Sequence, residues 1–379
     1  MNLVYLASPG TTFPSRSASS IHIMRMCEAF SQLGHDVTLI ASHKSNATPH
    51  EIFDFYGVAK SFHIKLIKLG KFKGKTLVFS LQQSLQGKKL RPDIIVSRSA
   101  QSAGISARLG LPVIYDSHGP IWLSSRIDDF FYELMRNNKH LRKMTVNSMA
   151  LKRIYQINNK LPHCDISVAH NGSTENGLVD YPAHWPGRPG CLQVGYMGHL
   201  YPGRGIEIII ECASRLPQFD FHIVGGMPDD IEHWKTQVDL TNVYFHGFIP
   251  PADVYKYRNK CDILLAPYKK NGVAVSGGRG DSSTYMNPIK IIEYMSSKKA
   301  IICSDLDILR EILDDTCCMF SSPNNVDAWV ASLIQLQDKS LRDRLSDNVY
   351  ARFKENLTWK ARARIMLSGF TSEHPESLL

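Results

Sequence analysis

Short apolar runs rich in β-branched residues alternate along the chain with segments of helical apolar periodicity. The runs at 3–7 and 37–41 enclose residues 21–30, whose apolar positions recur about every 3.6 residues, and Gly34 ends that segment. Similar apolar runs follow at 93–96, 112–115 and 166–169. Continuous apolar strands that alternate with helices indicate a parallel sheet covered on both faces, so the first part of the chain is predicted to be α/β.

The alternation stops between Asn171 and Gly190, where Asn, Gly, Pro, Trp and Ser occur without periodicity, as in a linker. It then resumes, with predicted strands at 192–197, 221–224, 243–248, 262–266 and 300–303 and predicted helices at 206–215, 252–259, 288–297 and 326–336. Two doubly wound, Rossmann-like domains in tandem are therefore expected, facing a cleft at the carboxyl ends of their strands, where such sheets bind ligands.

Charge separates the two halves of the chain. The protein has 379 residues, 43% of them hydrophobic, and a formal charge of +9. Residues 1–180 contain 22 Lys and Arg but only 12 Asp and Glu, a net charge of +10, so the remaining residues carry −1. Nine basic residues and no acidic one occur from Lys60 to Arg91. This asymmetry predicts an anionic partner for the first half, either a membrane surface or nucleic acid.

The sequence has features of a cytoplasmic protein. The first apolar run lacks a basic leader and reaches Pro9 too early for a secretion signal. No apolar stretch approaches the roughly 18 residues that a membrane span needs. The eight cysteines show no paired CxxC spacing. We therefore expect reduced thiols and a cytoplasmic location, with the inner face of the plasma membrane as the specific site if the basic segment binds lipid.

A glycine-rich loop links the predicted strand at 192–197 to the next helix. Its sequence is Gly198-His199-Leu200-Tyr201-Pro202-Gly203-Arg204-Gly205. Glycines let the backbone approach a phosphate, the helix N-terminus presents free N–H groups, and Arg204 can donate two hydrogen bonds to phosphate oxygens. An anion site is one interpretation, and an ordinary loop that opens an α/β helix is the other.

A lone acid interrupts the apolar helix predicted at 288–297. Glu293 lies beside Ile291, Ile292 and Met295, where burial of its carboxylate is costly unless it accepts hydrogen bonds. A ribose diol would supply such bonds. The alternative is that Glu293 faces solvent.

Together these motifs resemble the retaining, nucleotide-sugar-dependent glycosyltransferases of family 4, which have the GT-B fold. The resemblance also rests on Leu33-Gly34-His35-Asp36-Val37, His170-Asn171-Gly172, Cys261-Asp262-Ile263 and Pro288-Ile289-Lys290 in this order. It implies an N-terminal acceptor-binding domain at 1–172, with 360–379 packing back on it, a linker at 173–190, and a C-terminal donor-binding domain at 191–359. The implied reaction moves a sugar from a nucleotide diphosphate to a saccharide or lipid-linked acceptor, in bacterial surface polysaccharide or glycoconjugate synthesis.

The resemblance also assigns roles to individual residues. It implies catalytic roles for His118 and Arg204 and places two serines, Ser19 and Ser20, in the loop near the acceptor. For the donor, it implies Gly198, His199, Arg204 and Lys290 at the diphosphate, Tyr285, Met286 and Asn287 at the sugar, Glu293 at the ribose, and Phe248 and Ile249 at the base.

Arg204 stands where the family has a Lys and keeps its charge, whereas two further departures from the family pattern change the charge of the site. His199 replaces an Arg, and because histidine is mostly neutral near pH 7 the site has one fixed cation fewer. Tyr285 stands where the family has the first acid of a glutamate pair, so backbone N–H groups near Met286 and Asn287 are expected to take over its contacts. Lys290 would restore the missing charge, or else face solvent. Asp116, two residues before His118, is expected to be structural.

The donor is expected to be a UDP- or GDP-sugar, with no further cofactor and no metal, since Asp305-Leu306-Asp307 follows a strand in a fold that does not use this motif. Two other functions remain open: a nucleotide-sugar 2-epimerase of the same fold, which needs acids in the cleft, and a basic nucleic-acid-binding protein. No nucleic-acid-recognition motif is visible, so nucleic acid is not expected as a partner. The basic segment Lys60–Arg91 predicts contact with an anionic membrane, with a solvated basic face as the alternative.

Overall fold

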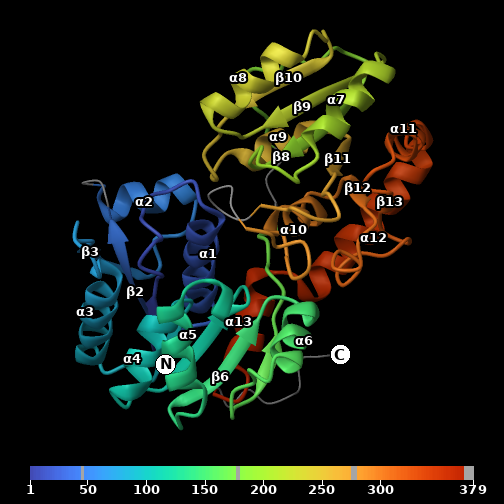
Figure 1. The fold of residues 1–379 in the computed structure, drawn as a ribbon. Coiled ribbons are helices and arrows are strands. Elements are labelled where there is room, and N and C mark those ends of the chain that lie inside the picture. The colour runs from blue at the N-terminus through green and yellow to red at the C-terminus, as the bar shows by residue number, and fades with distance from the viewer. Residues whose placement is uncertain (44–46, 176–179, 275–279, 371–379) are drawn as a thin grey trace.

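Two parallel sheets organise the computed structural model of the chain (Figure 1), which describes residues 1–43, 47–175, 180–274 and 280–370. Figure 1 shows the first sheet and its helices as one half of the molecule and the second sheet as the other. Both sheets have their early strands in the spatial order 3-2-1-4-5-6, the order of doubly wound dinucleotide-binding folds. The predicted α/β class is confirmed.

The first sheet has the strand order β3-β2-β1-β4-β5-β6-β7. Its strands are β1 (Asn2–Leu6), β2 (Asp36–His43), β3 (His63–Lys68), β4 (Ile94–Ser97), β5 (Val113–Ser117), β6 (Leu141–Val146) and β7 (Ile166–Val168). The connecting helices are α1 (Ala18–Gln32), α2 (Pro49–Tyr56), α3 (Lys75–Lys89), α4 (Ala100–Arg108), α5 (Arg126–Arg136) and α6 (Met149–Ile157), with a 3-10 turn η1 (Ile121–Leu123) before α5.

The second sheet has the order β10-β9-β8-β11-β12-β13. Its strands are β8 (Leu192–Met197), β9 (Phe219–Val224), β10 (Val243–Gly247), β11 (Ile263–Ala266), β12 (Ala300–Ser304) and β13 (Met319–Ser321). Its helices are α7 (Ile206–Arg215), α8 (Pro228–Gln237), α9 (Val254–Lys260), α10 (Ile289–Ser296), α11 (Val326–Gln335) and α12 (Lys339–Asn356), and the final helix is α13 (Trp359–Leu367).

Each sheet has a hydrophobic core on both faces, as parallel strands require. In the first half, α1, α2 and α13 pack on one face, and α4, α5 and α6 pack on the other. In the second half, α7 and α11 cover one face, and α10 and most of the apolar side of α12 cover the other. The chain therefore ends, within the described residues, on the first half, where Figure 1 shows red α13 among the blue and green elements.

The chain crosses between the halves at two adjacent points. Ser173 and Thr358 form an isolated parallel bridge, so the segment that leaves the first half runs beside the segment that returns to it. Gly172 allows this contact, because a Cβ there would lie 2.6 Å from the Trp359 backbone nitrogen. The predicted domain limits stay a prediction, as does the packing of 371–379, which lie outside the described residues.

Three strands of the structure were not predicted from the sequence. The apolar runs used for prediction correspond to β1, β2, β4, β5 and β7 in the first sheet and to β8–β12 in the second. β3, β6 and β13 had not been identified. β3 is an edge strand with Lys65 and Lys68 exposed, and β6 contains Arg142 and Lys143, so neither has a continuous apolar pattern.

Residues 180–190 of the predicted linker pack on the edge of the second sheet, whereas 176–179 lie outside the described residues. The Trp185 ring stacks on His222, with centroids 3.9 Å apart. His222 Nδ1 lies 3.0 Å from His246 Nε2, and His222 Nε2 lies 2.8 Å from Gln193 Oε1. Burial lowers the pKa of His222 to about 3 and that of His246 to about 4, so both rings are neutral near pH 7. The stack is therefore a neutral aromatic contact.

No helix in the described part of the chain is both long and apolar enough to cross a bilayer.

The stack predicts a loss of stability in acid. Because the folded pKa values of His222 and His246 lie below the ordinary value of about 6.5, the unfolded chain binds more protons between pH 6.5 and pH 4. The free energy of unfolding should therefore fall as the pH drops through this window. Thermal unfolding at pH 7 and pH 5 measures this decrease in stability. The double variant His222→Gln, His246→Gln should show a smaller decrease. The exposed His233→Gln is the control, and an equal fall in both variants would contradict the assignment.

Candidate active site

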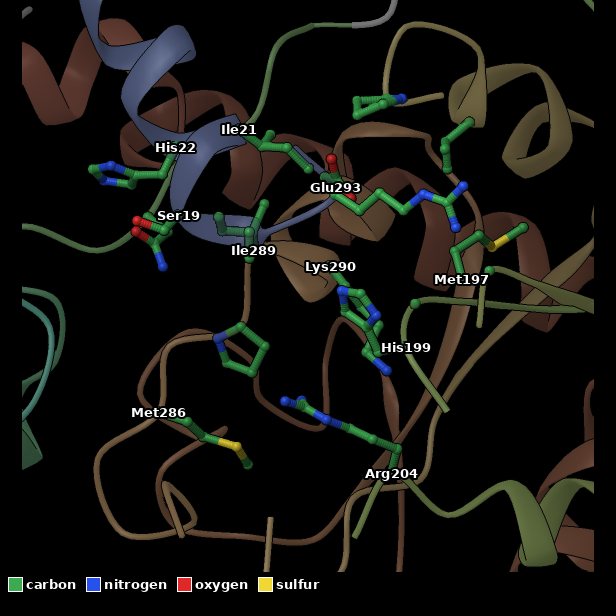
Figure 2. A pocket seen from close by; sticks show the side chains of 18 of the residues that line it. Ser19, Ile21, His22, Met197, His199, Arg204, Met286, Ile289, Lys290 and Glu293 are labelled. Atoms are coloured by element: carbon green, nitrogen blue, oxygen red, sulfur yellow. The ribbon is translucent and has the colours of Figure 1, made fainter. Parts of the chain in front are cut away.

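A cavity of about 370 Å³ lies between the two halves and is lined by residues at the carboxyl ends of both sets of strands. On the first half its wall contains Arg16, Ser19, His22, Arg98, His118, Asn147 and Asn171. On the second half it contains Gly198, His199, Arg204, Phe248, Ile249, Tyr285, Met286, Asn287, Lys290 and Glu293. In Figure 2, Ser19 and His22 from α1 lie across the pocket from His199, Arg204 and Lys290.

Strand topology explains the first wall. His118 follows β5, Asn147 follows β6 and Arg98 follows β4, so their side chains meet at one edge of the parallel sheet. His22 lies in the first turns of α1, which begins where the Ser17 side chain accepts a hydrogen bond from the Ser20 N–H.

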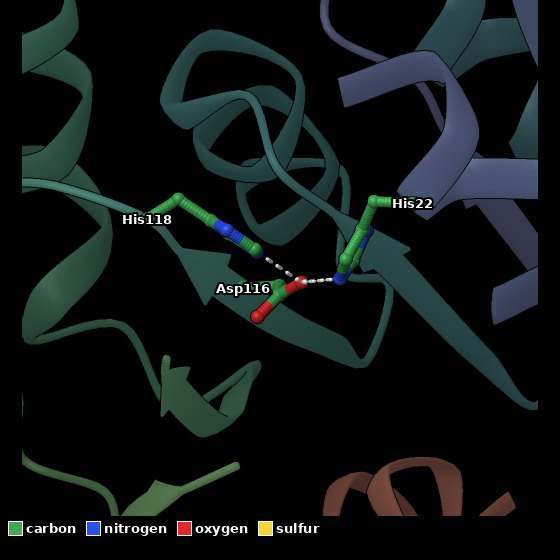
Figure 3. A group of neighbouring side chains, drawn as sticks. All are labelled: His22, Asp116 and His118. Atoms are coloured by element: carbon green, nitrogen blue, oxygen red, sulfur yellow. Dashed lines mark hydrogen bonds and ion pairs between the residues drawn. The ribbon is translucent and has the colours of Figure 1, made fainter. Parts of the chain in front are cut away.

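Asp116 lies directly behind this wall, fully buried at the end of β5. One of its oxygens, Oδ1, accepts hydrogen bonds from Arg362 at 2.6 Å and from Thr145 at 2.8 Å. The other, Oδ2, lies 3.0 Å from His118 Nε2 and 3.8 Å from His22 Nε2 (Figure 3). Burial alone would raise the pKa of Asp116, but the Arg362 guanidinium and His118 hold it well below its usual range. Asp116 is therefore a carboxylate.

The carboxylate fixes the tautomer of His118. Burial, and then the charge of Arg98, lower the pKa of His118 to about 4, although Asp116 opposes the shift. The neutral ring therefore carries its proton on Nε2, which donates to Asp116. Its Nδ1 has only a long contact of 3.4 Å from the Asn147 amide nitrogen, so Nδ1 is the atom that can accept a hydrogen bond from a ligand hydroxyl.

Arg362 reaches Asp116 from α13, and both side chains are fully buried. Its guanidinium also donates to the carbonyl oxygens of Ala169 and His170, just before the chain leaves the first half. The ion pair thus connects the last helix, the end of β7 and the residue that orients His118. The structural role expected for Asp116 agrees with this geometry.

His22, Asp116 and His118 are also arranged so that one atom of each lies within 4.8 Å of the others, as a metal site requires (Figure 3). Both oxygens of Asp116 already accept hydrogen bonds. Burial lowers the pKa of His22 most, and the positive charges of Arg98 and Arg362 lower it further. Two nearby guanidinium groups repel a cation. This cluster therefore suits a role in orienting the His118 ring, and it does not suit the binding of a metal ion.

Close backbone contacts shape the glycine loop of the second wall. Gly205 has a positive φ of 74° at the start of α7, and a Cβ there would lie 1.8 Å from the Pro267 carbonyl oxygen. Gly198 lines the pocket after β8, and its carbonyl oxygen would lie 2.2 Å from a Cβ on Gly225. Only glycine at 205 and 225 allows the loop to lie against the strand ends.

Among the residues that the structure describes, two cations of this wall lack the partners that buried charges normally have. Lys290, in the first turn of α10, has its ammonium buried without a hydrogen bond, 4.0 Å from the Tyr196 ring centroid and 4.6 Å from that of Tyr268. Burial, and then the charge of Arg204, lower the pKa of Lys290 well below its usual range. Arg204 donates to the Ala274 carbonyl oxygen at 2.7 Å, while its buried Nε has no partner. Lys290 therefore does not face solvent, and its charge lies close to that of Arg204.

His199 is not a third fixed cation. Burial lowers the pKa of His199, and its ring stacks on Tyr201 with centroids 4.6 Å apart. The nearby backbone of Arg16 opposes this shift. The ring is therefore neutral near pH 7.

Glu293 lines the second wall and forms an ion pair with Arg258 of α9, with 3.3 Å between Oε2 and Nη1. Its side chain remains 30% exposed, so its carboxylate can still accept hydrogen bonds from a ligand. Among the described residues that line the cavity, Glu293 is the only acid.

The segment before α10 touches the first half. Tyr285 packs on Gly119, next to His118, and its carbonyl oxygen accepts a hydrogen bond from Ser148 at 3.0 Å. The Asn287 side chain accepts a hydrogen bond from the Asn171 N–H at 2.6 Å, and its carbonyl oxygen accepts one from the Asn171 side chain. Met286 lines the cavity between them.

Phe248 and Ile249 close the other end of the cavity. The Arg16 guanidinium lies 3.9 Å from the centroid of the Phe248 ring, and Phe55 of α2 stacks on the ring from 6.3 Å. The first loop of one half thus covers the segment after β10 of the other.

The structure brings all but one of the predicted site residues to this cavity. Ser20 is the exception: it is buried behind the wall, and its hydroxyl bonds to Ser15 and Ser17 within the loop. Four further residues of the site were not predicted from the sequence: Arg16, Arg98, Asn147 and Arg258. Arg98 directly follows a predicted strand, which was an available signal, whereas Asn147 follows β6, which had not been identified.

Family models match most of the chain in two pieces. Residues 19–174 match the model described as Glycosyltransferase Family 4, and residues 191–339 match the model described as Glycosyl transferases group 1. No curated protein matches the sequence.

Solved structures with the same overall fold share little sequence with this chain. Sucrose-phosphate synthase from Thermosynechococcus elongatus superposes with a TM-score of 0.70 at 16% identity, covering 97% of each chain. Anabaena HepE in complex with UDP and glucose gives 0.71 at 14%, covering 98% of this chain and all of the other. The lipopolysaccharide outer core galactosyltransferase WaaB gives 0.64 at 15%, covering 97% and 99%. The two-sheet architecture is therefore the GT-B fold.

Loss of Arg362 should destabilise the protein strongly. Arg362→Met leaves Asp116 buried without its main counter-charge, so the free energy of unfolding should fall by about 3 to 5 kcal/mol. Urea unfolding followed by circular dichroism measures the change. Arg364→Met, at an exposed position of the same helix, is the control and should change stability by about 0.5 kcal/mol or less. Equal stability of the two variants would contradict the role of the pair.

Proposed function

This chain belongs to the family 4, group 1 glycosyltransferases, and we propose that it transfers a sugar from a nucleoside-diphosphate sugar to a saccharide or lipid-linked acceptor with retention of configuration. The observation that carries the proposal is the buried, unpartnered ammonium of Lys290 beside Arg204 in the cavity between the halves. A diphosphate would supply the counter-charge that both groups lack.

The same geometry supports the donor and its orientation. HepE was solved with UDP and with UDP-glucose, which supports a nucleoside-diphosphate sugar and favours UDP over GDP. In this proposal the diphosphate lies by Gly198, Arg204 and Lys290, with His199 as a neutral contact. The ribose hydroxyls donate to Glu293, the base lies by Phe248 and Ile249, and the sugar lies between Tyr285–Asn287 and His118.

The transfer proposed here takes place on one face of the sugar. The bond from C1 to the leaving phosphate oxygen breaks, the acceptor hydroxyl oxygen bonds to C1, and its proton passes to the leaving phosphate. Arg204 and Lys290 stabilise the negative charge that develops on the diphosphate. His118 Nδ1 accepts a hydrogen bond from a sugar hydroxyl and holds the ring in place. The charge stabilisation is supplied by the protein, so no metal enters the proposal.

The distribution of acids favours transfer over the alternatives. A double-displacement reaction or a 2-epimerase needs carboxylates placed in the cleft, and Glu293, the single acid on the described cavity wall, is already paired with Arg258. The concave, apolar-lined cavity also fits a small ligand better than a nucleic acid strand. The WaaB likeness supports a role in surface polysaccharide synthesis, at the cytoplasmic face where we expect the protein.

The function is tested with a panel of UDP- and GDP-sugars, with and without acceptor saccharides. Release of nucleotide should depend on the acceptor, and nuclear magnetic resonance of the product should show the anomeric configuration of the donor. Arg204→Ala should lower kcat by the equivalent of about 2 to 4 kcal/mol, the effect of losing one preorganised donor. Interconversion of nucleotide sugars without acceptor would instead establish an epimerase.

A binding measurement separates the diphosphate site from the chemistry. Lys290→Met should weaken UDP binding in calorimetry, because it removes the buried ammonium. Lys298→Met, at an exposed position just after the same helix, should leave the affinity unchanged. Equal affinity of both variants for UDP would remove Lys290 from the donor site.

We also propose that the first half binds an anionic membrane through α3. Val78, Leu81 and Leu85 recur along one side of this helix, and their side chains are more than two-fifths exposed. The flanking lysines Lys71, Lys73, Lys75, Lys88 and Lys89 are exposed as well. Some apolar residues of the basic segment Lys60–Arg91 do not belong to this surface. Phe79 is buried, and Leu66 and Ile67 pack against the hydrophobic cores on the two faces of the first sheet. Figure 1 shows α3 at the outer side of the first half, away from the second half.

Vesicle co-sedimentation tests this surface. At low salt the protein should sediment with phosphatidylserine vesicles and not with phosphatidylcholine vesicles, since each lysine near an anionic surface adds about 1 kcal/mol. Leu81→Gln combined with Leu85→Gln should reduce the bound fraction. Ile157→Gln, at a residue that is 80% exposed elsewhere on the first half, should not. Absence of binding to anionic vesicles at low salt would end this proposal.

A further inference from the structure

Arg98 is a cation of the cavity wall to which the family resemblance gives no role. It directly follows β4 and precedes Ser99, whose side chain caps α4 by accepting a hydrogen bond from the Ser102 N–H. Its side chain lines the cavity and is partly exposed there. Within the described ranges, its guanidinium has no hydrogen bond and no ion pair. Burial lowers the pKa of Arg98, so its charge is held in an unfavourable environment.

The groups around Arg98 do not balance its charge. Asp116 is the nearby carboxylate, and its oxygens already accept hydrogen bonds from Arg362, Thr145 and His118. His118 is neutral, as described above, and burial and Arg98 lower the pKa of His22 too. This side of the cavity therefore has three guanidinium groups, those of Arg16, Arg98 and Arg362, and one carboxylate, that of Asp116. An uncompensated buried charge is costly unless a ligand pairs with it.

Arg98 belongs to a different set of charges from the donor site. The residues that act most on its pKa are Tyr5, Asp116 and Arg362, all of which pack on the first sheet. The charge that acts most on Lys290 is that of Arg204, on the second sheet. The cavity thus has one group of cations on each wall, and the diphosphate of a single donor accounts for the group on the second wall only.

We propose that Arg98 binds an anionic group, a phosphate or a carboxylate, that the acceptor carries close to the hydroxyl that receives the sugar. This inference rests on the proposed transfer reaction, because it assigns the first wall to the acceptor. The planar guanidinium donates two parallel hydrogen bonds to the paired oxygens of either group. Arg98 lies at the strand end next to that of His118, so the anion binds beside the transferring sugar. The acceptor is therefore an acidic saccharide or a sugar phosphate rather than a neutral sugar.

The test uses matched probes on protein saturated with UDP. Glucuronate and glucose 6-phosphate are the acidic probes, and glucose is the neutral one, with binding followed by calorimetry. The acidic probes should bind the wild type roughly tenfold to a hundredfold more tightly than glucose, the range for a hydrogen bond to a charged group. Arg98→Met should abolish this preference and change the Kd of UDP less than about twofold.

A matched control and a conservative variant keep the result interpretable. Arg108→Met, at the exposed far end of α4, should keep the preference for acidic probes. Arg98→Lys retains the charge without the planar fork, so it should keep part of the preference, and it replaces Arg98→Met if that variant does not fold. Circular dichroism and UDP binding report on folding.

Three results would overturn the proposal. One is equal binding of acidic and neutral probes to the wild type. Another is an unchanged preference in both Arg98 variants. A loss of UDP affinity in Arg98→Met with unchanged probe binding would assign Arg98 to the donor diphosphate instead.

A wild type that binds neither UDP nor GDP would contradict the proposed function itself. Titration of the same probes into the protein without UDP would then test Arg98 alone.

Discussion

The buried ion pair between Asp116 and Arg362 is the constraint on which the rest of this structure depends. Asp116 terminates a strand of the first sheet, whereas Arg362 comes from a helix near the other end of the chain. Neither charge is tolerable alone in the interior, so α13 must dock on the first half. Because α13 follows directly from α12, this docking also fixes the second crossing between the halves beside the first one, at Ser173 and Thr358. The tautomer of His118 follows from the same carboxylate.

Buried cations are stabilised differently on the two sides of the cavity. Behind the first wall, Arg362 is paired within the protein and serves the structure. On the cavity surface, Lys290 lies against two tyrosine rings, whose faces offset only part of the cost of burial. Cations held in this way are preorganised for an anion, because their hydrating water is already removed when the protein folds and need not be removed when the anion binds.

The sequence predicted the doubly wound halves and most of the cavity, because continuous apolar strands and glycine loops are local signals. β6 was missed because Lys143 lies within it. Lys143 is buried, and its ammonium donates to Ile365 and Ser368, more than 200 residues away, so no local pattern could show that a lysine belongs in a core strand. Ser20 was expected near the acceptor, yet capping bonds turn its hydroxyl back into the loop. The pairing of Glu293 with Arg258 joins two helices and is equally invisible in the sequence.

Tyr285 stands where the family has an acid, and this difference changes the charge of the second wall. An acid at this position would lie beside Gly119 and His118, where the proposed transfer places the sugar, and would add a negative charge there. The tyrosine replaces that charge with an apolar contact between the halves, and its burial raises its own pKa, so it stays neutral. Among the described residues, the ammonium of Lys290 has no hydrogen-bond partner, so its charge remains available to a ligand. In the proposed function, the anion that completes the site therefore comes from the donor and not from a side chain of the protein.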